Sequence, residues 1–157
     1  MTPTLSGRIQ TRILMAIFIG VPWTLIVTPF LPGNRGGRSL GDVATTLYPT
    51  TFTALGLMAL IGAVLWEPIY HGLQQYRWER DWPTMFALLV VIPEAILLWY
   101  VLREVGPDNE GIATRTTFIV HIASTWVLIW LFVIGPIRVL FPRYRFRGGR
   151  LLGTWKR

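Results

Sequence analysis

Four long stretches of the chain carry almost no charge, and the charged residues gather between them. The stretches run over positions 13–34, 43–66, 82–102 and 116–137, and Glu94 is the only Asp, Glu, Lys or Arg within them. A helix needs about 20 apolar residues to cross a hydrocarbon core of roughly 30 Å, and backbone polar groups in lipid must be satisfied within the segment. All four stretches are long enough. The pattern predicts an all-α integral membrane protein with spans at about positions 13–31, 48–68, 83–102 and 116–137.

Composition supports the same class. Hydrophobic residues make up 52% of the 157 residues and charged residues 15%, whereas a soluble domain carries roughly 25% charged residues. A soluble single domain, a disordered chain and a disulfide scaffold are therefore excluded. The chain contains no Cys, so thiolate metal sites are excluded as well. We expect one membrane domain over positions 1–157, ending in a basic tail at 138–157.

The distribution of basic residues predicts the orientation. Four spans place both termini and the central loop on one face, and that face holds eleven of the fifteen Arg and Lys residues, against four on the other. The positive-inside rule then puts the N- and C-termini in the cytoplasm of a cell membrane. The net charge of +7 is explained by this topology, and no nucleic-acid partner is expected. Arginine outnumbers lysine fourteen to one, which is associated with GC-rich genomes and favours a bacterial source.

Prolines occupy corresponding positions in the two halves of the chain. Pro22 and Pro93 lie within the first and third spans, while Pro68 and Pro136 lie at the ends of the second and fourth. The number of residues from Pro22 to Pro93 is nearly the same as the number from Pro68 to Pro136. A duplicated helical hairpin gives such offsets, so a 2+2 pseudo-repeat is one interpretation, with chance similarity as the other. In either case each proline removes a backbone donor and is expected to disturb its helix.

Glu94 is the sharpest chemical feature, because a charged side chain near the middle of a span costs at least ~3 kcal/mol. It must be protonated, paired or turned toward a polar cavity. The functional interpretations are a proton carrier, an ion ligand or a contact to a cofactor or partner. The structural interpretation is a carboxyl group bonded to a neighbouring helix. His121 is the predicted partner, since its depth from the outer end differs by only ~5 Å from that of Glu94.

The two histidines, His71 and His121, lie near opposite ends of their spans, at depths that differ by about 20 Å. They cannot both ligate one haem within a single chain, so haem ligation would need a second chain. The usual nucleotide-binding, hydrolase and metalloprotease motifs are absent from the sequence. We therefore expect no catalytic residues and no metal site, and the sequence leaves any cofactor unknown.

The basic tail alternates arginine with aromatic residues. Arg143, Arg145, Arg147 and Arg150 are expected to contact anionic lipid head groups or an acidic partner, because each basic residue near an anionic surface contributes around 1 kcal/mol. An Arg-Gly-Gly element at 147–149 also suits RNA. A second such element at 35–37 lies on the outer face, which weakens that alternative.

Three functional hypotheses follow. The first is a non-catalytic accessory, assembly or anchoring subunit of a larger membrane complex, with a homo-oligomer left open. The second is a redox anchor that shares a haem or quinone site with another chain through Glu94 and His121. The third is a small proton-coupled transporter that works through Glu94.

Overall fold

The computed structural model describes residues 4–32, 40–76, 84–106 and 114–141, together with Tyr144 and Arg150. These residues are helical throughout their long segments, and no strand occurs among them. The elements in chain order are α1 (Leu5–Met15), the π-helical segment Ala16–Gly20, α2 (Val21–Val27), the 3-10 turn Thr28–Phe30, α3 (Leu40–Ile61), the π-helical segment Gly62–Trp66, α4 (Glu67–Gln75), α5 (Thr84–Leu89), α6 (Val91–Val105), α7 (Arg115–Ile134) and α8 (Pro136–Leu140).

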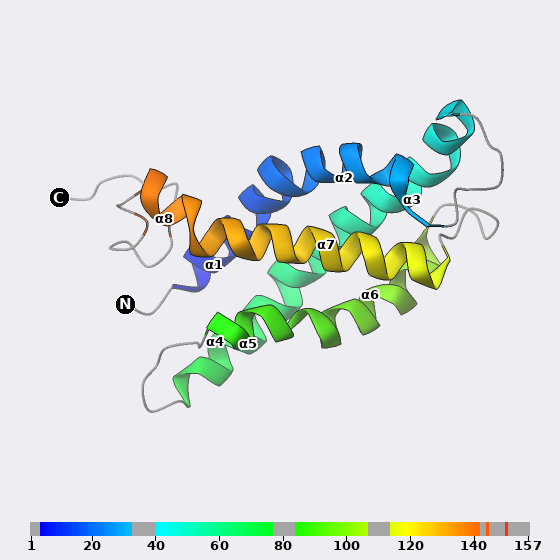
Figure 1. Ribbon diagram of the computed structural model, residues 1–157. Helices are drawn as coiled ribbons and strands as arrows, with labels where there is room; N and C mark the ends of the chain where they lie inside the picture. The colour runs from blue at the N-terminus through cyan, green and yellow to red at the C-terminus, as the bar shows by residue number, and fades with distance from the viewer. Residues whose placement is uncertain are drawn as a thin grey trace.

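These elements join into four helices that are long and apolar enough to cross a membrane. Their bounds are Leu5–Phe30, Thr45–Gln75, Met85–Val105 and Arg115–Leu140. Four long apolar helices were predicted, and they lie over the four uncharged stretches of the sequence; that they cross a membrane stays a prediction. Figure 1 shows the helices packed side by side as a bundle. The end of the bundle where α1 begins, α4 ends and α8 ends is here called the terminal end.

The first two helices extend further toward the terminal end than the sequence predicts. The first begins at Leu5, where the Thr4 hydroxyl accepts a hydrogen bond from the Gly7 backbone N–H at 3.2 Å, a typical N-cap. Two arginines that the charge pattern places before the span, Arg8 and Arg12, are therefore inside the helix. The second helix continues through Pro68 to Gln75. The pattern of positions 69–81, with Ile69, Leu73 and Tyr76 on one side, predicts a short interfacial helix after this span; its part from position 77 lies outside the described residues.

Departures from regular α-helix stand close to four of the prolines, as predicted. The two π-helical segments end shortly before Pro22 and Pro68, and the regular helices are interrupted at Val90 and Gly135, shortly before Pro93 and Pro136. A proline ring clashes with the carbonyl one turn earlier and disturbs the preceding turn at these four positions, whereas α3 continues through Pro49. In the first half of the chain the departures are π-helical segments, and in the second half they are breaks between helices. The pseudo-repeat stays a prediction.

The apolar core is small and the apolar exterior is large. The core is formed by eight buried residues from the four long helices: Ala16, Ala54, Leu55, Met58, Leu98, Leu102, Phe118 and Ile122. Only 17% to 28% of the most apolar window of each long helix is buried within the bundle. Large side chains such as Phe18 and Val64 are instead two-thirds exposed. Contiguous apolar exteriors of this extent are atypical of soluble monomers.

Candidate functional site

Arg12 lies at the centre of a buried network of charged side chains. Its Nη1 and Nη2 donate to the two carboxylate oxygens of Glu94, at 2.7 and 2.9 Å. Its Nη1 also lies 3.3 Å from the Met58 carbonyl oxygen. The side chains of Arg12 and Glu94 are only 9% and 5% exposed. This two-bond geometry is the strongest form of arginine–carboxylate pairing.

Glu67 links Arg12 to a second arginine. One carboxylate oxygen of Glu67 accepts from Arg12 Nε at 3.0 Å, and the other accepts from Arg8 Nε at 3.1 Å. Arg8 Nη1 in turn donates to the Gln74 side-chain oxygen at 2.9 Å. The order of the network is therefore Arg8, Glu67, Arg12, Glu94. Two arginines and two glutamates balance in charge, and they tie α1 to α4 and α6.

The local structure brings these side chains together. Arg8 and Arg12 are four residues apart in α1 and therefore lie on one side of that helix. Glu67 is the first residue after the π-helical segment Gly62–Trp66, and a π-helical turn shifts the residues that follow it around the helix axis. The Arg12 guanidinium packs against Gly62 so closely that a Cβ at that position would overlap with Arg12 Nη1.

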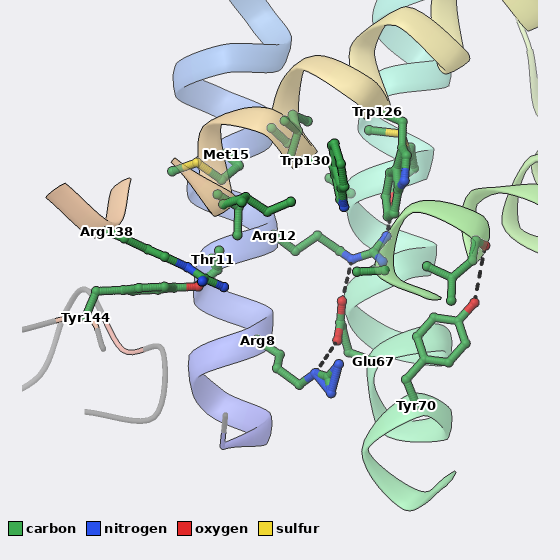
Figure 2. A pocket seen from close by; sticks show the side chains of 18 residues that line it. Arg8, Thr11, Arg12, Met15, Glu67, Tyr70, Trp126, Trp130, Arg138 and Tyr144 are labelled. Atoms are coloured by element: carbon green, nitrogen blue, oxygen red, sulfur yellow. Dashed lines mark hydrogen bonds and ion pairs between the residues drawn. The ribbon is translucent and has the colours of Figure 1, made fainter. Parts of the chain in front are cut away.

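A cavity of about 260 Å³ adjoins the network at the terminal end. Figure 2 shows Arg8, Arg12 and Glu67 on one side of it and Trp126 and Trp130 of α7 nearby. The Arg12 guanidinium lies 5.3 Å from the ring centroid of Trp126, a cation–π contact. The walls are otherwise mostly apolar side chains of the four long helices, including Met15, Ala16, Met58, Ala87, Ile129 and Val133.

His121 belongs to a separate polar cluster. Its Nε2 shares a hydrogen bond of 2.9 Å with the Thr24 hydroxyl, and both residues are at most 1% exposed. The Thr125 hydroxyl donates back to the His121 carbonyl at 2.7 Å. The hydroxyls of Thr28 and Thr51 are 3.1 Å apart in the same half of the bundle. Hydroxyls here satisfy the polar groups that the spans bury.

The predicted hydrogen bond between Glu94 and His121 needs correction. Glu94 pairs with Arg12 and His121 pairs with Thr24, so each has a different partner from the expected one. Similar depth in the membrane is necessary for a contact but does not determine which way two helices are turned. Ser124 lies three residues after His121, and helical spacing predicts it on the same side of α7. Its hydroxyl donates to the His121 carbonyl at 3.1 Å and accepts from Trp23 Nε1 at 3.1 Å.

The remaining candidate residues either form no hydrogen bond or ion pair with the network or lie outside the part of the chain that the structure describes. Arg143, Arg145 and Arg147 are outside the described residues. Arg150 Nε donates to the Thr4 hydroxyl at 3.2 Å. His71 has a buried Nδ1 without a hydrogen-bond partner in the described part of the chain.

Sequence reasoning missed Arg8, Arg12 and Glu67 as site residues. The charge pattern treats the two arginines as topology signals alone, and the position of Glu67 directly before Pro68, at the end of the second span, predicts that it lies in the head-group zone. A signal was present, because Glu94 required a cation and Arg12 is the basic residue nearest to the first span. Arg12 lies seven residues into its helix and Glu94 ten residues after α5 begins, a depth difference of about 5 Å that a long arginine side chain can bridge.

The fold and the network define the class of this chain: an all-helical protein with four helices long and apolar enough to cross a membrane, joined by buried ion pairs. Within the described ranges no group of three or more His, Cys, Asp or Glu residues is arranged to hold a metal ion. Comparison with known protein families, with curated proteins and with solved structures finds no match for the chain.

The Thr24–His121 contact gives a direct test of the polar cluster. Thr24→Val removes the hydroxyl while keeping the shape, and leaves the buried His121 Nε2 without its partner. We expect the free energy of unfolding to fall by about 1 kcal/mol, measured by denaturant titration in mixed micelles. Thr53→Val is the matched control, because the Thr53 hydroxyl donates only to the Pro49 carbonyl of its own helix. Equal losses in both variants would contradict a special role for the pair.

Proposed function

We propose that this protein is a small, non-catalytic multi-pass membrane protein that acts as an accessory, assembly or anchoring subunit of a larger membrane complex. The exposed apolar side chains of all four long helices support insertion in a bilayer. The excess of arginine on the face of both termini supports a cytoplasmic location for the terminal end in a cell membrane.

The proposal rests on one observation: both carboxylate oxygens of each buried glutamate, Glu67 and Glu94, are bonded to arginines. Both oxygens of Glu94 are bonded to Arg12, and both oxygens of Glu67 are bonded to arginines. A carboxylate held by two bonds to a buried guanidinium is poorly suited to carry protons or ions. The network therefore favours a role in holding helices together over the transport hypothesis.

The position of His121 speaks against the redox hypothesis. A haem shared with a second chain must reach the ligating nitrogen from outside this bundle. His121 is 1% exposed and its Nε2 is engaged with Thr24. The geometry thus gives no support to a shared haem site through His121.

An apolar groove on the outside of the bundle supports assembly with a partner. It runs between α1 and the second long helix and is lined by eight uncharged residues: Ile9, Ile13, Gly56, Ala59, Leu60, Ala63, Val64 and Pro68. A Cβ added at Gly56 would meet nothing within 4 Å. Small side chains let helix backbones approach closely in membranes. We propose that a transmembrane helix of the partner subunit occupies this groove.

Native electrophoresis of the full-length protein, solubilised from its own membrane in mild detergent, tests the proposal. We expect the wild type to run in an assembly much larger than 17.9 kDa, with partner subunits recovered in fixed ratio to it. Gly56→Phe places a bulky ring in the groove and should reduce the recovered partner about tenfold, which corresponds to a binding loss of roughly 1.4 kcal/mol.

Gly72→Phe is the matched control, because Gly72 lies on the same long helix, outside the groove, and also has open space around it. It should leave the assembly intact. A wild-type protein that migrates as a lone monomer under these conditions would overturn the proposed function. An assembly unaffected by Gly56→Phe would overturn the groove as its interface.

A further inference from the structure

We propose that the cavity beside the charged network binds the phosphate group of an anionic amphiphile, with Arg138 as its principal anion contact. The ligand class is a phospholipid that carries one negative charge, its head group at Arg138 and the first part of its chains against the aromatic wall. The cavity and the groove are separate hollows that share one lining residue, Ala59.

Counted over the described residues, the charges at the cavity leave one cation without an acidic partner. Three arginines line it, Arg8, Arg12 and Arg138, and one glutamate, Glu67. With Glu94, which pairs with Arg12 from behind, three positive charges face two negative ones, and the difference is one. Among the described residues Arg8 and Arg12 have carboxylate partners. The Arg138 backbone N–H donates to the Gly135 carbonyl at 3.1 Å, but its guanidinium forms no hydrogen bond or ion pair with any residue in the ranges that the structure describes.

The position of Arg138 suits an anion at the edge of the cavity. Arg138 lies in α8, and its side chain is exposed at the terminal end. Figure 2 shows it extending from α8 toward Thr11 of α1, across the cavity from Glu67. A guanidinium offers a planar fork of donors that matches phosphate oxygens, and it is more weakly hydrated than an ammonium group.

The rest of the wall suits a ligand with an apolar part. Trp130, Ile129, Val133 and Met15 line the cavity together with the arginines. Its volume of about 260 Å³ is more than ten times the roughly 15 Å³ that one water requires. An apolar pocket with a few convergent polar groups is typical of small-molecule sites. A small inorganic anion would leave most of this wall without contacts, whereas an amphiphile would cover it.

Native mass spectrometry of the delipidated full-length protein tests the inference with three ligands. These are phosphatidylglycerol, phosphatidylcholine with matched acyl chains, and inorganic phosphate. We expect saturable binding of phosphatidylglycerol at least tenfold tighter than of phosphatidylcholine. Arg138→Ala should weaken that binding at least tenfold, because it removes the charge-assisted hydrogen bonds. Val133→Trp should weaken it as well, since the ring fills the apolar part of the cavity without changing its charge.

Arg150→Ala is the control for charge. It removes one positive charge from the same end of the chain, but Arg150 does not line the cavity. Equal weakening by Arg138→Ala and Arg150→Ala would show general surface attraction and overturn the site. Equal affinity for the two phospholipids would overturn its selectivity for an anion. Inorganic phosphate bound as tightly as phosphatidylglycerol would overturn the amphiphile.

Discussion

Arg12→Leu is expected to lower the free energy of unfolding by about 3–5 kcal/mol, the largest effect of any single substitution in this chain. The substitution removes the cation that neutralises Glu94 and half of Glu67, and leaves both carboxylates inside the bundle. Breaking a buried pair from one side costs this much because the remaining charge stays desolvated and unpaired. Unfolding of the reconstituted protein in mixed micelles, followed by tryptophan fluorescence, measures the loss.

Two further variants separate the network from general loss of charge. Arg8→Leu also removes a cation from α1, but among the described carboxylates Arg8 contacts Glu67 alone, and its side chain is more exposed, at 13% against 9% for Arg12. Its cost should be less than half that of Arg12→Leu. The double variant Arg12→Leu with Glu94→Leu should recover part of the stability, since an apolar pair replaces an ion pair at similar volume. A cost for Arg12→Leu no greater than for Arg8→Leu would contradict the central role of Arg12.

The four long helices were predictable because crossing a bilayer requires a certain apolar length, and that length can be read directly along the chain. The ends of the helices were less predictable. Arg8 and Arg12 were read as flanking charges, because a count of arginines treats each one as a marker of position. The structure places them inside α1, where carboxylates from other helices balance them. A charged residue thus marks the end of a span only if it has no buried partner.

The site was predicted in part. A charge in lipid is costly, so the position of Glu94 within an apolar span already predicts that it needs a partner. The identity of that partner did not follow. Depth along a helix can be counted at about 1.5 Å per residue, but the rotation of each helix cannot. In this chain Glu94 faces Arg12, and His121 faces Thr24 instead.

Gly62→Ala is expected to destabilise the protein by about 2 kcal/mol, although alanine is the better helix former. In an open helical position the exchange of glycine for alanine stabilises by about 0.5–1 kcal/mol. At Gly62 the new methyl group would overlap with the Arg12 guanidinium, so Arg12 would have to withdraw from Glu94. Overpacking of this kind costs roughly 1–3 kcal/mol.

Gly56→Ala is the matched control in the same long helix, because the added Cβ meets nothing within 4 Å. Opposite signs for the two substitutions, measured by unfolding in mixed micelles, are the expected result. A stabilising Gly62→Ala would mean that Arg12 does not pack against this helix.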